Sequence, residues 1–147
     1  MRRVMMLGFS FIVIFSGLAL AQEARVVSFK GNVLVKENKI SKWKKAHENM
    51  RLGPDVQIKT KGNSICTLTF DENKKSIVTI EKASAVKIES VQPGSIFLSK
   101  GRVFALIKNI NESKKFEVKT PTAVAGARGT GWMTEFDGKK TSVSCSA

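Results

Sequence analysis

The sequence predicts an all-β fold, and three observations support this prediction. Short runs of alternating apolar and polar residues recur along the chain, turn-forming residues separate them about every 8 to 12 positions, and helical periodicity is scarce. Valine, isoleucine, phenylalanine and threonine dominate these runs, as expected for half-buried strands. We therefore expect about ten short strands wound into a compact β-roll, a solenoid-like stack or a sandwich.

The first expected strands are Ala24–Lys30 and Val33–Glu37. Gly31-Asn32 lies between them and predicts a two-residue hairpin turn. The segment 43–50 carries a helical spacing of apolar residues for two turns at most. We interpret this segment as an irregular loop anchored by the side chain of Trp43.

The rest of the chain repeats the pattern of short strands between turns. A break is expected at Lys100-Gly101, which separates two of the strands. The expected strands of this part are 56–60, 64–70, 76–81, 86–88, 96–98, 103–107, 116–118, 132–136 and 141–145. No linker, low-complexity tract or strict internal repeat interrupts them, so we expect one domain.

The N-terminus has the pattern of a secretory signal peptide. A basic start at Arg2-Arg3 precedes an apolar run from Val4 to Phe15 and an Ala19-x-Ala21 ending. We expect cleavage after Ala21, which divides the chain into a signal peptide (1–21) and a periplasmic or secreted β domain (22–147). The alternative is an uncleaved membrane anchor, although the apolar run is short for a bilayer span of about 20 residues.

The charge of the chain limits its partners. The 25 Lys and Arg residues against 12 Asp and Glu residues give a formal charge of +13. Such an excess attracts acidic surfaces and is screened by salt. For an exported protein, the expected partners are an envelope protein with an acidic face or an anionic lipid or wall polymer, and not a nucleic acid. The alternative is a solvated surface without a ligand.

The two cysteines, Cys66 and Cys145, allow a single disulfide pairing in an exported chain. Closing a loop of that length would stabilise the fold by about 4 to 5 kcal/mol in the chain-entropy model. Cys66 alternates with apolar neighbours, however, which also suits a buried free thiol. The residues alone leave both alternatives open.

The sequence carries no signature of an enzyme, a cofactor site or a metal site. His47 is the single histidine, so there is no cluster of histidines for a metal and no separate base for a serine nucleophile. No serine lies in a Gly-x-Ser-x-Gly turn. Gly129 and Gly131 do not follow a strand and precede a helix as in a phosphate-binding loop. We therefore expect a protein that binds and does not catalyse.

One motif near the end of the chain stands out. Thr120-Pro121 leads through a stretch of small residues into Arg128-Gly129-Thr130 and then Trp132. Proline restricts the backbone at the start of this segment, and glycine permits unusual dihedral angles at its end. We interpret Arg128 and Thr130 as a clamp that holds the last strands to the domain. The alternative is a contact with a ligand or partner.

Together with earlier stretches, this motif resembles the FecR-like domain, which is named after the envelope regulator of ferric-citrate uptake. The similar stretches are Gly31–Val35, Trp43 with Ala46, Leu52–Thr60, Leu98–Val103, Phe116–Pro121 and Arg128–Thr130. The resemblance implies an all-β domain on the outer side of the inner membrane that acts as a protein-binding or sensory module.

The sequence also departs from the regulators of that family. Those regulators carry a cytoplasmic arm that contacts a sigma factor, whereas here the export signal stands directly before the domain. We therefore do not expect sigma-factor signalling. The expected alternatives to a protein-binding module are a basic binder of anionic wall or membrane polymer and a structural subunit of an envelope assembly.

Overall fold

The computed structural model describes residues 23–108, 115–127 and 131–146. This part of the chain contains 13 strands and no helix, which confirms the expected all-β fold. The strands are β1 (Ala24–Lys30), β2 (Val33–Lys36), β3 (Lys44–Lys45), β4 (Arg51–Leu52), β5 (Gln57–Thr60), β6 (Ile65–Thr69), β7 (Ser76–Ile80), β8 (Ala85–Ser90), β9 (Ser95–Ile107), β10 (Phe116–Lys119), β11 (Val124–Ala127), β12 (Gly131–Phe136) and β13 (Thr141–Ser146).

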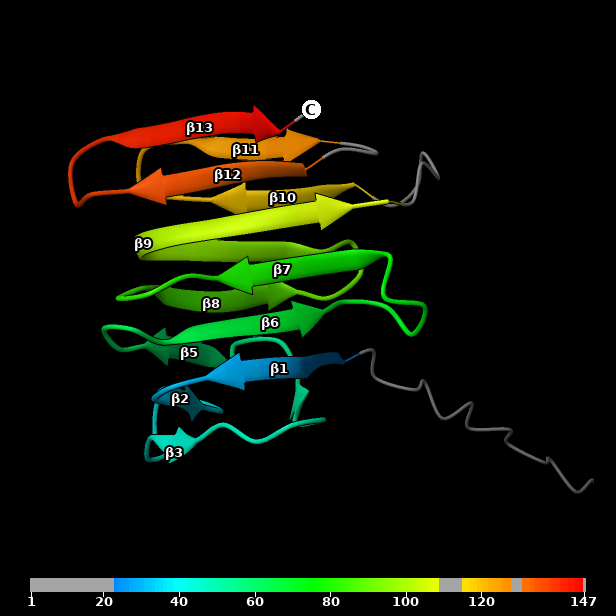
Figure 1. Cartoon of the computed structure of the whole chain (residues 1–147), viewed down its shortest axis with the longest axis vertical. Coiled ribbons are helices and arrows are strands. Elements are labelled where there is room, and N and C mark those ends of the chain that lie inside the picture. The colour runs from blue at the N-terminus through cyan, green and yellow to red at the C-terminus, as the bar shows by residue number, and fades with distance from the viewer. Residues whose placement is uncertain (1–22, 109–114, 128–130, 147) are drawn as a thin grey trace, which may run out of the picture.

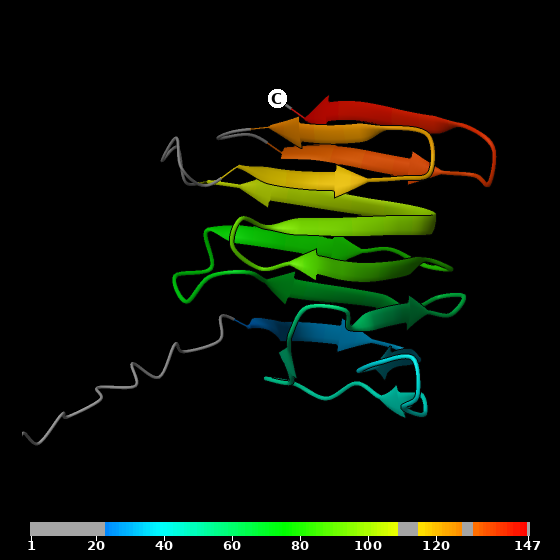
Figure 2. The same cartoon turned by 180° about the vertical axis from the view of Figure 1, so that it is seen from behind.

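The strands form two layers that lie face to face (Figure 1). Layer A has the order β4–β1–β6–β7–β9–β12–β13, and layer B has the order β3–β2–β5–β8–β9–β10–β11. β3 and β4 lie at the lower end of the stack, and from β5 the chain climbs toward β13 as it crosses repeatedly between the layers. Figure 2 shows the same stack from behind. The arrangement is a solenoid-like sandwich, as the sequence predicts.

Strand β9 belongs to both layers. Its first half pairs with β8 and β10 in layer B, and its second half pairs with β7 and β12 in layer A. The chain crosses between the layers at Gly101, whose φ is +98°. The sequence analysis expected two strands separated at Lys100-Gly101, and that expectation is wrong. The glycine bends one continuous strand of 13 residues, because its backbone can adopt a φ that other residues resist.

The expected hairpin at Gly31-Asn32 is also wrong. Strands β1 and β2 do not pair with each other: β1 pairs with β4 and β6 in layer A, and β2 pairs with β3 and β5 in layer B. The segment between them is an arc that joins the two layers. Ser64 Oγ fixes this arc by accepting a hydrogen bond of 2.8 Å from the Asn32 N–H.

The segment 43–50 is irregular, as expected, apart from the two-residue strand β3. Ala46 and Met50 point into the core, where they are 7% and 6% exposed. Trp43 lies on the outer side of layer B and is only partly buried. The anchor role expected for Trp43 therefore belongs to Ala46 and Met50.

The core fills the space between the layers with alternating residues from both. Its largest fully buried side chain is Trp132, and most of the others are leucine, isoleucine and valine. The Phe116 ring packs edge-on against two aromatic neighbours, at centroid distances of 5.0 Å from Phe70 and 6.3 Å from Trp132. Such edge-to-face pairs add to the stability that burial of the rings already provides.

Candidate functional site

The Thr-Pro part of the predicted motif forms the turn between β10 and β11. The Thr120 side chain is buried, and its Oγ1 accepts hydrogen bonds from the backbone N–H groups of Thr122 and Ala123, at 3.3 and 3.0 Å. The Thr120 N–H donates to the Ala123 carbonyl at 2.8 Å. Pro121 is exposed at the corner. The hydroxyl of Thr120 therefore fixes the shape of the turn.

The same turn is held to layer A through Thr141, the first residue of β13. Thr120 Oγ1 and Thr141 Oγ1 are 2.6 Å apart, and Thr122 Oγ1 also contacts the Thr141 hydroxyl. These hydroxyl contacts join the β10–β11 hairpin of layer B to the β12–β13 hairpin of layer A. A clamp between the last strands is thus present, and it is made by threonine residues.

The rest of the motif divides between the core and the part of the chain that is not described. Arg128, Gly129 and Thr130, to which the sequence analysis assigned the clamp or a partner contact, lie outside the described residues. Trp132 is 1% exposed and packs against Phe116, so it serves the core and does not contact a partner at the surface.

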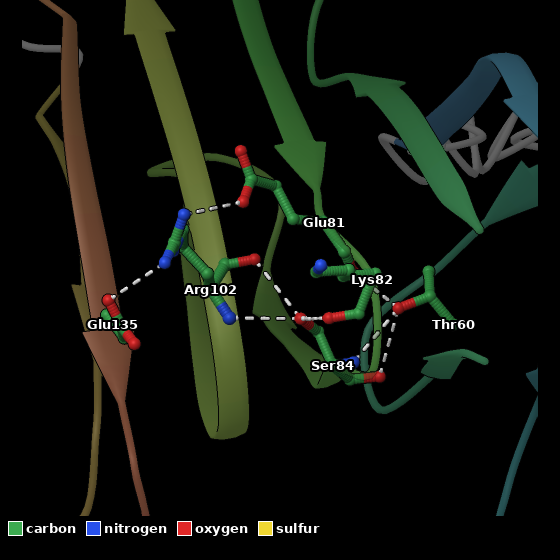
Figure 3. Close-up of polar contacts among 6 residues, drawn as sticks. All are labelled: Thr60, Glu81, Lys82, Ser84, Arg102 and Glu135. Carbon is green, nitrogen blue, oxygen red and sulfur yellow. Dashed lines mark hydrogen bonds and ion pairs between the residues drawn. The ribbon is translucent and has the colours of Figure 1, made fainter. Parts of the chain in front are cut away.

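A second polar cluster surrounds Ser84, where the chain passes from β7 to β8 (Figure 3). Ser84 Oγ accepts a hydrogen bond of 2.9 Å from the Arg102 N–H and lies within hydrogen-bond distance of the Arg102 and Lys82 carbonyls. The Ser84 N–H donates to Thr60 Oγ1 at 3.0 Å. The cluster therefore joins three successive crossings between the layers through buried side chains.

The Arg102 guanidinium extends this cluster over the outer face of layer A. It lies 3.3 Å from carboxylate oxygens of both Glu81 and Glu135 (Figure 3). Because all three side chains are substantially exposed to water, these pairs add little stability. A single guanidinium thus bridges two carboxylates that come from different strands of layer A.

The two cysteines are both free thiols. Cys66 is buried on β6, and Cys145 is exposed on β13. Three strands of layer A separate them, so they are about 19 Å apart at a strand spacing of about 4.8 Å. A disulfide requires Cα atoms closer than about 7 Å. The structure thus contains the buried free thiol and not the disulfide.

Burial raises the pKa of the Cys66 thiol to about 12. The fold therefore favours the neutral thiol, whereas the thiol of an unfolded chain ionises at a pH of about 8.5. The neutral Cys66 thiol therefore stabilises the fold fully below about pH 8.5, and this stabilisation is lost as the pH rises toward 12.

We expect the wild type to lose about 1.4 kcal/mol of unfolding free energy per pH unit, relative to Cys66→Ala, between about pH 9 and 11. Urea unfolding of both proteins at several pH values measures this difference. Cys145 remains in both proteins and does not affect the comparison. Parallel pH profiles would show that the Cys66 thiol ionises as easily in the fold as in the unfolded chain.

The single histidine lies at the surface, and possible metal ligands do not cluster in the described part of the chain. His47 is exposed, and its Nδ1 lies 3.1 Å from the Glu48 carbonyl oxygen. Within residues 23–108, 115–127 and 131–146, no three His, Cys, Asp or Glu side chains are grouped so that they could hold a metal ion. No helix in these same ranges is long and apolar enough to span a membrane.

The outer face of layer A carries a row of apolar side chains that we call the apolar strip. It consists of Ile65, Ile77, Phe104, Leu106 and Met133, all on the phase of their strands that points away from the core. Strand pairing places Ile77 beside Leu106 and Phe104 beside Met133. A Cβ at Gly131 would lie 2.9 Å from the Phe104 ring, so this glycine allows the ring to lie against the sheet.

The outer face of layer B carries a shallow groove of about 220 Å³ that we call the basic groove. Its walls contain two aromatic side chains, Trp43 and Phe97, and two basic side chains, Lys59 and Lys87. Lys59 Nζ lies 4.7 Å from the centroid of the Trp43 ring, and Lys36 Nζ lies 5.7 Å from it. The sequence analysis missed this site, because its residues come from loop 37–43 and from three strands whose pairing a single sequence does not reveal.

A comparison with protein-family models decides the family. The model described as FecR protein matches residues 56–147, which is 92 of the 147 residues. The chain belongs to the FecR family. The resemblance seen in the sequence is thereby confirmed, although the match does not include the earlier stretches at Gly31–Val35 and Trp43. Searches of the curated proteins and of the solved structures found no match.

Family membership places the domain among regulatory or sensory modules related to the cell envelope. The matched range of the FecR model contains the whole Ser84 cluster and the Thr120 turn. It also contains all five residues of the apolar strip, on β6, β7, β9 and β12. Trp43 of the basic groove and the neighbouring Lys36 lie before it. The FecR match thus covers the apolar strip completely and the basic groove in part.

Proposed function

We propose that this FecR domain is an exported, non-enzymatic module of the cell envelope that binds a regulatory protein partner through the apolar strip. One observation carries the proposal: five apolar side chains point outward from a layer whose inner face already fills the core. Strand pairing joins Ile77 to Leu106 and Phe104 to Met133, whereas Thr67 and Thr79 separate Ile65 from these four. Apolar surface of this kind characterises protein-binding sites. Export rests on the leader at 1–21, which lies outside the described residues.

The surroundings of the apolar strip indicate the chemistry of the partner. Arg25 and Lys30 are exposed on β1, where Lys30 lies opposite Ile65 and Arg25 lies opposite Thr69. Neither has an ion-pair partner within 4.0 Å among the residues that the structure describes. An interface with an apolar centre and a charged rim follows the usual organisation of protein complexes. We therefore expect a partner with an apolar centre and an acidic rim.

The test compares two variants that carry lysine substitutions on opposite layers. In the first variant, Phe104→Lys/Leu106→Lys, the centre of the apolar strip carries two charges. The control, Phe97→Lys, changes a partly exposed aromatic side chain on the other face of the same strand β9. Proteins cross-linked to the mature wild type in envelope fractions are identified, purified and titrated against all three forms of the domain.

The strip variant should bind the identified partner about 100-fold or more weakly, because central apolar residues carry most of the binding energy of an interface. The Phe97→Lys control should bind as the wild type does. Urea unfolding establishes that both variants are folded. Equal binding by the strip variant, or a loss confined to Phe97→Lys, contradicts the proposal.

A further inference from the structure

We propose that the basic groove of layer B binds an acidic polysaccharide, with one carboxylate-bearing sugar beside Trp43 and the chain running across the strands. The groove lies on the layer opposite to the apolar strip, so this site is separate from the proposed protein interface. Its walls combine aromatic surface, ammonium groups and the polar side chains Gln57 and Ser99. This combination matches a ligand with sugar rings and negative charge.

The first support is a pair of cations without anions. The ammonium groups of Lys36 and Lys59 lie near the same indole ring, and within the described part of the chain neither has a carboxylate within 4.0 Å. Other lysines of layer B do have such partners, for example Lys119, which lies 3.0 Å from Glu89. An anionic group of a ligand would therefore not have to displace a carboxylate of the protein from either ammonium group. The site is thus electrostatically prepared for an anion.

The second support is the aromatic surface of the groove. Trp43 and Phe97 are partly exposed, and both line the groove. Aromatic rings of this kind supply apolar contact area for the C–H faces of a sugar ring. A volume of about 220 Å³ is below the range of about 300–1,000 Å³ that encloses drug-sized ligands. The groove therefore suits one sugar of a longer chain and not a whole small molecule.

The third support is a row of side chains that strand pairing places across layer B. Lys36 lies beside Gln57, Gln57 beside Lys87, Lys87 beside Phe97, and Phe97 beside Lys119. The three lysines are thus on every second strand, about 10 Å apart at a strand spacing of about 4.8 Å. A linear polymer with regularly spaced carboxylates can meet all three. Lys87 lies 3.7 Å from the exposed Asp55, which a ligand displaces at little cost, whereas Lys119 donates a 3.0 Å hydrogen bond to the partly buried Glu89.

These features favour a polysaccharide over a lipid surface. A flat membrane reaches side chains that protrude, whereas Trp43 and Phe97 form the walls of a depression. A linear chain can enter such a depression and continue over the row of lysines. Lipid binding and binding of any polyanion are therefore separate outcomes that the experiment distinguishes.

The experiment measures the binding of the mature domain to polygalacturonate and to hyaluronan at low salt. Three comparison ligands are used: methyl-esterified polygalacturonate, which has the same sugars without charge, polyglutamate, which has charge without sugars, and vesicles of phosphatidylglycerol. The variants are Lys36→Gln/Lys59→Gln, Trp43→Ala and the control Lys139→Gln/Lys140→Gln. The control removes the same charge from the exposed β12–β13 turn.

We expect at least one of the two acidic polysaccharides to bind, and the groove variants to bind it about tenfold more weakly than the control. Esterification should abolish binding. The proposal is wrong if neither polysaccharide binds, if the charge-matched control loses as much affinity as the groove variants, or if polyglutamate or vesicles bind equally well. Because Phe104→Lys/Leu106→Lys leaves the groove intact, it should bind the polysaccharide normally whether or not the protein-binding proposal holds.

Discussion

Replacing Gly101 by alanine should lower the free energy of unfolding by about 3 kcal/mol or more, as measured by urea unfolding. Two effects combine at this position. The backbone has a φ of +98°, which a residue with a Cβ resists. The added Cβ would also overlap Ser84 Oγ and lie 2.6 Å from Ser84 Cα. The backbone atom cannot move without disturbing the hydrogen bonds of Ser84 to Thr60 and Arg102.

Gly138 provides a matched control for this substitution. Its φ is +100°, almost the same as that of Gly101, but a Cβ there would meet no atom within 4 Å. Gly138→Ala should therefore cost only the backbone strain, about 1 to 2 kcal/mol. The difference between the two variants measures the crowding against Ser84. Equal losses would mean that the crossing of β9 between the layers is looser than its contacts indicate.

Replacing Trp132 by alanine should cost about 3 to 5 kcal/mol of unfolding free energy, because it leaves a large cavity between the layers. The Trp132 ring is 1% exposed and packs edge-on against Phe116. Its indole N–H has no hydrogen-bond partner among the described residues, so the loss comes from packing and not from a broken hydrogen bond. Chemical unfolding monitored by far-ultraviolet circular dichroism measures it.

The other tryptophan serves as the control. Trp43 is partly exposed on the outer face of layer B, and we expect Trp43→Ala to cost about 1 kcal/mol, as for a side chain that keeps water contact in the fold. Trp132→Phe should recover most of the loss, since it retains an aromatic ring beside Phe116. If both alanine variants lost the same stability, the distinction between a core tryptophan and a surface tryptophan would not hold.

The sequence predicts the strands of this fold well and their pairing poorly. The alternation of apolar residues identifies Ala24–Lys30 and most later strands within one or two residues, because each strand buries one face. The same alternation is compatible with a hairpin and with an arc between layers, since the buried face points to the core in both. Gly31-Asn32 and Gly101 therefore looked like turns, although they are crossings between the two layers.

For the candidate sites, too, the sequence indicates local features but not the contacts between distant segments. The Thr120-Pro121 pattern predicts a restricted backbone but not the turn that the structure forms there, and the contact with Thr141 depends on how two hairpins meet. The basic groove requires residues from loop 37–43 and several strands to come together. Lys59 and Lys87 lie on the outward phase of their strands, yet nothing in the order of residues places Trp43 beside them.

Because β9 takes part in both layers, neither layer can detach without breaking a strand of the other. Phe97 and Phe104 lie on this one strand and point to opposite outer surfaces of the molecule. Unfolding should therefore be a single cooperative event, and a pull on either surface is resisted by the hydrogen-bonded ladders of both. A domain anchored to a polymer on one side and to a protein on the other would withstand tension as one unit.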